Sequence, residues 1–187
     1  MLATIDETVL VYDKRQLDAW KSGDKALIPQ FVKIPAIVGN QPGYHFGEMY
    51  ALRWYHEREG WLGFSSYALG SQYAGSERRA EGRAKAEEVI PRSRLMKLRR
   101  LRSGEHLGTG EPDLFLYKTD GSFKFVEVKK QRDRLSAAQL SCIAQILAVL
   151  KCPVDIAYLR ERSQDYTAKR YVFDLKTMKG SRLPDSA

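Results

Sequence analysis

Two carboxylates and one lysine, Asp113, Glu127 and Lys129, stand in the part of the sequence richest in potential chemistry. Side chains of a strand alternate between its faces, so Glu127 and Lys129, two residues apart, should project the same way. Carboxylates that meet inside a sheet repel each other and lose hydration, so a bound cation is needed to stabilise their charged forms. Oxygen ligands favour a hard cation such as Mg²⁺ or Mn²⁺, and a neighbouring ammonium can orient a water. The three residues therefore predict a metal centre.

A β-hairpin would bring these residues together. The runs Leu114–Tyr117 and Phe123–Lys129 have the composition of strands, and the Asp-Gly turn between them is typical of antiparallel pairing. Asp113, just before the first strand, would then lie across from Glu127, near the end of the second strand. The valines on either side of Glu127 would pack on the opposite face of the sheet.

The residues around the hairpin also resemble a known family. Pro112-Asp113 with the later Glu127-Val128-Lys129 is similar to the PD-(D/E)xK nuclease signature. A longer string resembles the VRR-NUC domain, the virus-type replication-repair nuclease, and consists of Gly110-x-Pro112-Asp113-Leu114, Phe125-Val126-Glu127-Val128-Lys129 and Asp133-Arg134-Leu135-Ser136-x-x-Gln139. This resemblance covers about residues 46 to 160. It implies an α/β fold of restriction-endonuclease type, with a mixed central sheet flanked by helices.

The resemblance also implies an activity and a set of site residues. The activity is metal-dependent hydrolysis of DNA phosphodiester bonds, with Mg²⁺ or Mn²⁺ as the cofactor. Lys129 would position the attacking water. The ions would be held by Asp113, Glu127, the carbonyl of Val128 and Glu48.

Glu48 and Gln139 each have a structural alternative. Glu48 stands where the family places a glutamate, early in a predicted helix, but Glu57 and Glu59 on the same helix compete with it, and a helix glutamate can simply face solvent. Gln139 stands where the family places a glutamine near its active site. Ser136-x-x-Gln139 is also a capping box, in which the two side chains satisfy backbone groups at a helix start. Both interpretations of Gln139 can hold together.

The charge of the chain favours a polyanionic partner. The formal net charge is +8 and the pI is about 9.5, which fits DNA, although a solvated basic surface would give the same values. Leucines at every third position from Leu95 to Leu101 predict a short helix with one anchored face. The opposite face would form a basic strip for phosphate contact, made of Arg92, Arg94, Lys97, Arg99, Arg100 and Arg102. Lys130 and Arg134 are weaker candidates for the same contact.

The chain divides into an N-terminal extension (residues 1–45), a VRR-NUC-like domain (46–160) and a C-terminal strand and tail (161–187). Residues 68–109 form a basic helical insert, longer than the connection in compact family members, and its role is left open. The expected helices are Lys14–Lys21, Phe46–Glu59, Glu77–Val89 and Ala137–Leu150. The expected strands, besides the hairpin, are Thr8–Tyr12, Phe31–Val38, Trp61–Tyr67, Val154–Leu159 and Arg170–Leu175, and residues 176–187 are expected to be a mobile tail.

The composition and the N-terminal residues indicate a cytoplasmic protein. No apolar run approaches the roughly 20 residues of a membrane helix, and no secretory signal is evident. Two cysteines make no disulfide framework, and Cys142 fits a buried apolar position.

Several functions remain open within this frame. Structured or branched DNA in replication, repair or recombination is the expected substrate, with a homodimer suited to a symmetric junction. A second hypothesis is an antibacterial DNase toxin, whose partner would be an immunity protein. A non-catalytic DNA-binding module is disfavoured, because such a module has no need for the costly Asp113–Glu127–Lys129 cluster.

Overall fold

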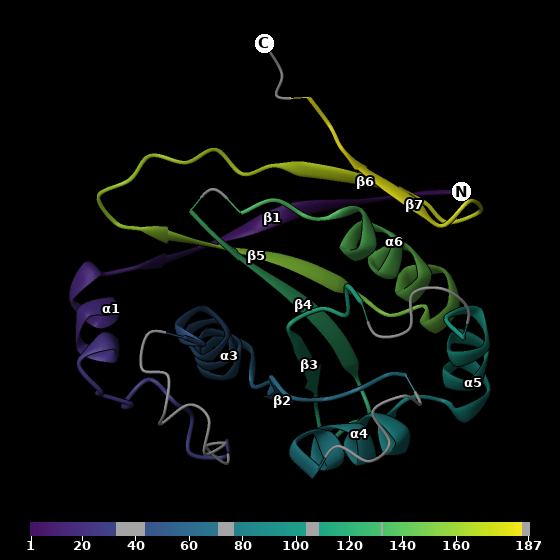
Figure 1. Cartoon of the computed structure of the whole chain (residues 1–187), viewed down its shortest axis with the longest axis horizontal. Helices are drawn as coiled ribbons and strands as arrows, with labels where there is room; N and C mark the ends of the chain where they lie inside the picture. The colour runs from purple at the N-terminus through teal and green to yellow at the C-terminus, as the bar shows by residue number, and fades with distance from the viewer. Residues whose placement is uncertain (33–43, 71–76, 104–108, 132, 185–187) are drawn as a thin grey trace.

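The computed structural model describes residues 1–32, 44–70, 77–103, 109–131 and 133–184. One seven-stranded mixed sheet runs through the molecule in the order β2-β3-β4-β5-β1-β6-β7 (Figure 1). The strands are β1 (Leu2–Tyr12), β2 (Leu62–Phe64), β3 (Leu114–Tyr117), β4 (Phe123–Lys130), β5 (Val154–Glu161), β6 (Arg170–Asp174) and β7 (Lys179–Arg182). The helices are α1 (Lys14–Lys21), α3 (Phe46–Glu59), α4 (Glu77–Val89), α5 (Arg92–Leu101) and α6 (Ala137–Gln145), which continues as the π-helical turn η2 (Ile146–Leu150).

The centre of the sheet is parallel and its two sides are antiparallel. β5 pairs in parallel with β4 and with β1, and the connection from β4 to β5 passes through α6. The antiparallel pairs β2–β3 and β3–β4 lie on one side, and β1–β6 and β6–β7 on the other. A crossover helix between parallel strands begins near the carboxyl end of the first strand. The start of α6 therefore lies beside the end of β4, where the predicted site residues stand.

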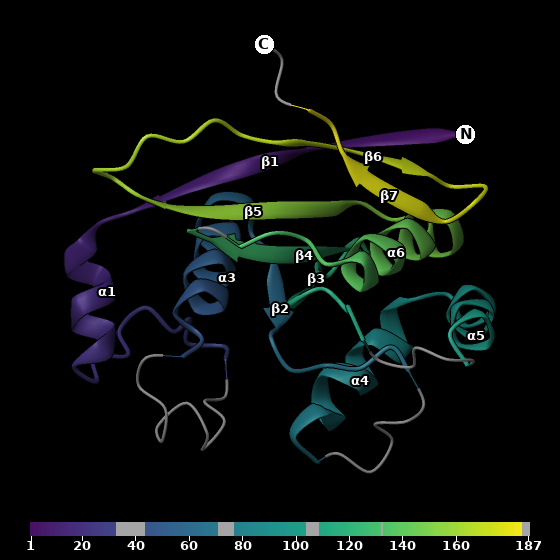
Figure 2. The ribbon, with the colours of Figure 1, turned by 45° about the horizontal axis from the view of Figure 1, so that its top comes forward.

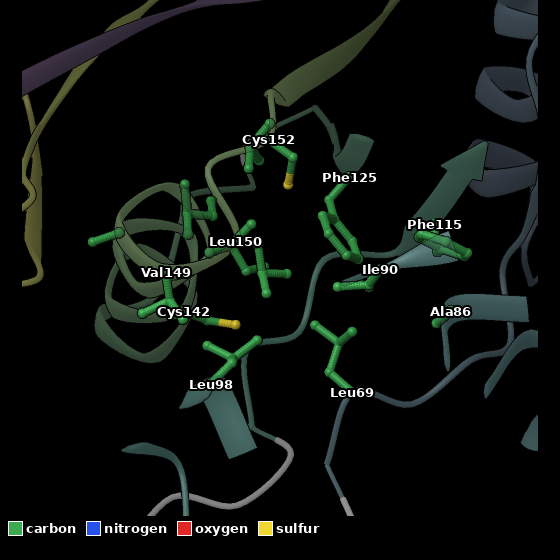
Figure 3. Packing of buried hydrophobic residues seen from close by; sticks show 14 of the residues in the cluster. Leu69, Ala86, Ile90, Leu98, Phe115, Phe125, Cys142, Val149, Leu150 and Cys152 are labelled. Carbon is green, nitrogen blue, oxygen red and sulfur yellow. The ribbon is translucent and has the colours of Figure 1, made fainter. Parts of the chain in front are cut away.

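Helices cover both faces of the sheet (Figure 2). Successive side chains of β4 point to opposite faces and pack into two separate hydrophobic cores. Val126 packs with Leu52 and Tyr55 of α3 on one face. Phe125 packs on the other face, in a core that includes residues of α4, α5, α6 and η2 (Figure 3). Cys142 and Cys152 are free and buried in this second core, which confirms Cys142 as a small buried hydrophobe. This two-sided burial holds β4, and with it Glu127 and Lys129, in a fixed place.

The strand β1 begins at Leu2, earlier than the predicted start at Thr8, and lies between β5 and β6 inside the sheet. Its second half pairs with β5 through Glu7–Tyr12, and its first half pairs with β6 through Leu2–Asp6. The acidic pair Asp6-Glu7 obscures the strand pattern in the sequence. Asp6 pairs with Arg170 across the strands, and Glu7 is buried, accepting hydrogen bonds from the hydroxyls of Tyr166 and Tyr171. Residues 2–12 of the N-terminal extension are thus part of the central sheet.

Most of the predicted elements are present, and three expectations need correction. The helices Lys14–Lys21, Phe46–Glu59 and Glu77–Val89 have the predicted bounds, whereas the strand predicted at Trp61–Tyr67 is shortened to Leu62–Phe64. Of the strand predicted at 31–38, the first two residues lie in a turn and the others lie outside the described residues. The prediction of a mobile tail is wrong for residues 179–182, which form β7. Gly180 lies so close to the Phe173 ring that a Cβ there would be 2.5 Å from it, a contact invisible in the polar sequence of β7. No helix among the described residues is long and apolar enough to cross a membrane.

Candidate active site

The β3–β4 hairpin places its two acids opposite each other, as predicted. Leu114 pairs with Val126, so Asp113, one residue before Leu114, stands opposite Glu127, one residue after Val126. The backbone pairing of β3 and β4 ends at Leu114, and the side chain of Asp113 makes the next contact with β4. Its Oδ2 accepts a hydrogen bond from the backbone N–H of Val128 at 2.8 Å. A cleft of about 260 Å³ at this end of the hairpin is lined by all five predicted catalytic residues, Glu48, Asp113, Glu127, Lys129 and Gln139.

Lys129 and Gln139 bind the same oxygen of Glu127. Lys129 Nζ lies 2.8 Å from Glu127 Oε1, and Gln139 Nε2 donates a hydrogen bond to that oxygen at 2.5 Å. Lys129 Nζ also donates to Gln139 Oε1 at 3.2 Å, which closes a three-membered network. The capping box is present as well, with Ser136 N donating to Gln139 Oε1 and Gln139 N to Ser136 Oγ. Both interpretations of Gln139 therefore describe contacts that the side chain makes.

Burial makes both acids hard to ionise. Burial raises the pKa of Glu127 to about 8, with a further contribution from the negative charge of Asp113, against the opposing effects of Lys129 and Gln139. Burial also raises the pKa of Asp113 to about 6, although the hydrogen bond from the Val128 N–H lowers it. One lysine does not neutralise two buried carboxylates, so the pair is poised to gain from a cation.

The second oxygen of Glu127 supports a metal ligand at this position. Glu127 Oε2 is buried and has no hydrogen-bond partner among the described residues. A buried acceptor without a partner costs free energy, and a hard cation is a chemically suitable partner for a carboxylate oxygen. The described residues contain no preassembled group of three or more His, Cys, Asp or Glu that could hold a metal. Asp113, Glu127 and Val128 line the same cleft, and the two carboxylates are chemically suited to hold a divalent metal as a two-carboxylate site.

Glu48 borders the cleft from α3 but is bonded to a neighbour. His45 Nδ1 lies 3.1 Å from Glu48 Oε1, three residues along the helix start. Burial acts to raise the pKa of Glu48, but the hydrogen bond with His45 and the positive charge of Lys130 bring it below its ordinary value. The ionised form of Glu48 is therefore favoured, and it lies in the same cleft as Asp113 and Glu127. Its competitor Glu59 bonds Lys124, and Glu57 is exposed and pairs with Arg53. The sequence offered no spacing that singled out His45 as the partner of Glu48.

The basic strip is only partly available to a ligand. Arg102 is buried and donates to Gln145 Oε1 and to the Thr109 carbonyl, so the prediction that it contacts DNA needs correction. Arg94 donates to the Leu150 carbonyl, and Arg99 bonds the Leu69 carbonyl and Glu87. These contacts arise because α5 packs among segments distant in sequence, with η2 among them, and the leucine spacing could not reveal them. Arg92, Lys97, Arg100, Lys130 and Arg134 are exposed, and of these Lys130 lines the cleft.

The mixed sheet, the helices on both faces and the hairpin carrying Asp113, Glu127 and Lys129 define a restriction-endonuclease-like fold. The VRR-NUC domain family model matches residues 65–161, and the chain belongs to this family of nucleases. Nucleases of this family generally use divalent metals. No curated protein and no solved structure matches the chain significantly.

Gly110 allows the Pro112-Asp113 turn to approach the start of α6 closely. Its replacement is therefore expected to lower the stability of the fold. Its φ is +76°, and a Cβ there would lie 2.5 Å from the backbone of Ala138, next to Gln139. Gly110→Ala is expected to lower the free energy of unfolding by about 3 kcal/mol, from left-handed strain and overpacking together. Urea unfolding of the metal-free protein measures this change.

Gly121→Ala is the matched control for this prediction. Gly121 has a φ of +83° and no atom within 4 Å of an added Cβ, so it carries the strain without the contact. The control is expected to cost only about 1 kcal/mol. Equal costs for the two variants would show that the turn does not press against α6.

Proposed function

We propose that this protein is a metal-dependent DNA phosphodiester hydrolase of the PD-(D/E)xK type, using Mg²⁺ or Mn²⁺ and acting on structured or branched DNA. The observation that carries the proposal is the buried Oε2 of Glu127, opposite Asp113, which has no hydrogen-bond partner in the part of the chain that the structure describes. It belongs to the same side chain whose Oε1 contacts Lys129. A protein that only binds DNA would gain nothing from three charged groups held at this cost.

Asp113, Glu127 and the Val128 carbonyl would hold the metal, with Glu48 as a further ligand from α3. A bound divalent ion supplies Lewis-acid polarisation of the phosphate and a lower pKa for a bound water. The backbone N–H of Val128 holds Asp113 in place, and Gln139 holds Glu127 in place. These hydrogen bonds keep both carboxylates oriented before substrate arrives.

Lys129 would position the attacking water and stabilise negative charge on the phosphate. The residue is 8 % exposed, and its ammonium is held by Glu127 and Gln139. A charge fixed in a poorly hydrated site stabilises a transition state more strongly than a charge in water does. The start of α6 lies at the same end of β4, and the positive end of its helix dipole favours a bound phosphate there.

The proposal is tested by incubating the protein with labelled single-stranded, duplex, flap and four-way-junction DNA in Mg²⁺, Mn²⁺ or EDTA. We expect cleavage that requires metal, and the preferred substrate identifies the DNA structure that the enzyme acts on. Metal-independent cleavage would contradict the proposal. Absence of cleavage together with tight, salt-sensitive binding would favour a DNA-binding module instead. Toxicity on expression that Asp113→Ala abolishes would favour the toxin hypothesis for the biological role.

A further inference from the structure

A second polar cleft opens next to the catalytic one. It has a volume of about 260 Å³ and shares His45, Glu48 and Asp113 with the catalytic cleft, so the two are continuous. Its other walls come from the loop after β2 and from the first turn of α4, where Arg78 and Arg79 line it. We call this space the arginine cleft. Nothing in the catalytic network described above uses either arginine.

The helix that carries these arginines is anchored to the catalytic turn. Gly82 of α4 lies against Ser66 and Tyr67, and an added Cβ would be 2.4 Å from the Ser66 carbonyl. Ser66 Oγ donates to the carbonyl of Arg78, and the buried hydroxyl of Tyr67 donates to the carbonyl of Pro112 at 2.6 Å. Tyr67 therefore touches α4 through its backbone and the residue before Asp113 through its hydroxyl. This chain of contacts fixes Arg78 and Arg79 relative to the scissile position.

The charges in the arginine cleft are unevenly matched. Arg78 is exposed, and its side chain has no carboxylate partner among the described residues. Glu111, which also lines the cleft, interacts electrostatically with Arg102 and Arg79, and its carboxylate accepts from the backbone N–H groups of Leu69 and Gly70. Arg78 is thus the principal free cation of the cleft, and Arg79 is offset in part by Glu111.

The arginine cleft leads onward to a third cleft. This outer cleft, of about 440 Å³, shares Ser65, Ser66 and Arg78 with the arginine cleft. It is lined further by Phe31 and Phe64, and on the α4 side by Lys85 with Glu81 and Glu88. A succession of small clefts, cationic in the middle and aromatic beyond, suits one flexible strand, in which phosphates meet arginines and bases meet aromatic rings. In a duplex the bases are paired and stacked inside the helix, so they cannot meet aromatic rings in this way. The arrangement therefore favours a single strand.

We propose that the arginine cleft is a subsite for a single-stranded segment of the DNA substrate, in which Arg78 and Arg79 bind a backbone phosphate next to the scissile one. The subsite rests on the proposed nuclease function and adds to it the substrate class. It also gives the insert a role, because α4 supplies one wall of the path that the strand follows.

The test measures binding in EDTA, so it does not depend on cleavage. The probe is an oligothymidylate of about 12 nucleotides, within the range of single-strand binding sites. Arg78→Ala/Arg79→Ala is expected to weaken binding roughly ten- to thirtyfold at 0.1 M salt and to reduce the slope of log affinity against log salt by about 0.7, for the one lost phosphate contact. Affinity for a blunt duplex of the same length is expected to change little.

The matched control removes two exposed lysines from α1, with Lys14→Ala/Lys21→Ala, and should leave the slope for the single strand unchanged. Neutral methylphosphonate linkages, placed one at a time along the strand, then locate the contact. At one position the neutral linkage should weaken binding to the unmodified protein but not to the double arginine variant. Additive losses at every position, or an equal loss for single-stranded and duplex DNA, would overturn the subsite. If the protein binds in this way but cleaves nothing, the nuclease proposal fails and the subsite stands.

Discussion

Lys129→Ala is expected to lower the rate of metal-dependent DNA cleavage about a hundred- to a thousandfold, the usual effect of removing one preorganised electrostatic group. Lys129 Nζ is held between Glu127 Oε1 and Gln139 Oε1, at 2.8 and 3.2 Å, and its side chain is 10 % exposed. Alanine removes the charge and leaves Glu127 without its ion-pair partner. The loss should fall on kcat rather than on DNA affinity, because the group acts on charge that develops during the reaction.

Lys179→Ala provides the comparison for this variant. Lys179 is an exposed lysine on β7, at the far edge of the same sheet, and its removal should leave cleavage unchanged. Thermal unfolding of both variants checks that each is folded at the assay temperature. A Lys129→Ala protein that is folded and cleaves as fast as the unmodified protein would remove Lys129 from the mechanism.

Glu127→Gln is expected to abolish cleavage and, in the absence of metal, to stabilise the fold at alkaline pH. Because the pKa of Glu127 in the folded protein is raised from 4.5 to about 8, the folded state resists ionisation that the unfolded chain undergoes freely. The stability of the unmodified protein is therefore complete below about pH 4.5 and falls as the pH rises toward 8. Glutamine does not ionise, so the variant escapes this loss. At pH 8 the gain should be about 4 kcal/mol, or about 12 °C in Tm.

Three measurements separate this effect from general stabilisation. The Tm difference should vanish near pH 4, where Glu127 is protonated in both states. Added Mg²⁺ should stabilise the unmodified protein and have less effect on Glu127→Gln, which has lost a ligand. Glu57→Gln, an exposed glutamate on α3, should change neither the Tm nor cleavage. A Glu127→Gln protein that is less stable at pH 8 without metal would mean that the carboxylate is ionised and well solvated in the fold.

The hairpin and its acids were predictable because their signals are local. The alternation around Glu127, the Asp-Gly turn and the position of Asp113 before a short apolar run are enough to pair the two acids. The helix bounds of α3 were predictable for the same reason, since Gly60 ends the apolar pattern with a left-handed cap. The approach of Glu48 to this hairpin came from the family resemblance, because no local rule says where a helix packs on a sheet.

The features that were mispredicted or unassigned depend on partners distant in sequence. In the sequence, Arg102 cannot be distinguished from an exposed arginine of a basic helix. In the structure its guanidinium donates hydrogen bonds to Gln145 and to the Thr109 carbonyl. The strand β7 has almost no apolar residues and forms because Gly180 fits against Phe173. Arg78 and Arg79 belong to no sequence motif. They line a cleft together with Asp113 because α4 packs closely against Tyr67 at Gly82. Such contacts follow from the tertiary arrangement rather than from composition or period.

The pairing of β1 has a consequence for how the protein is made. Glu7 pairs with Ile156 and Ala3 with Phe173, so β1 is synthesised long before its partners β5 and β6. Contacts of such long sequence separation form late and slowly. On the ribosome, the hairpin with Asp113 and Glu127 therefore emerges before the sheet that supports it can close. A nascent chain carries the complete catalytic motif without a complete enzyme, and cleavage activity should arise only after β5 and β6 have left the exit tunnel.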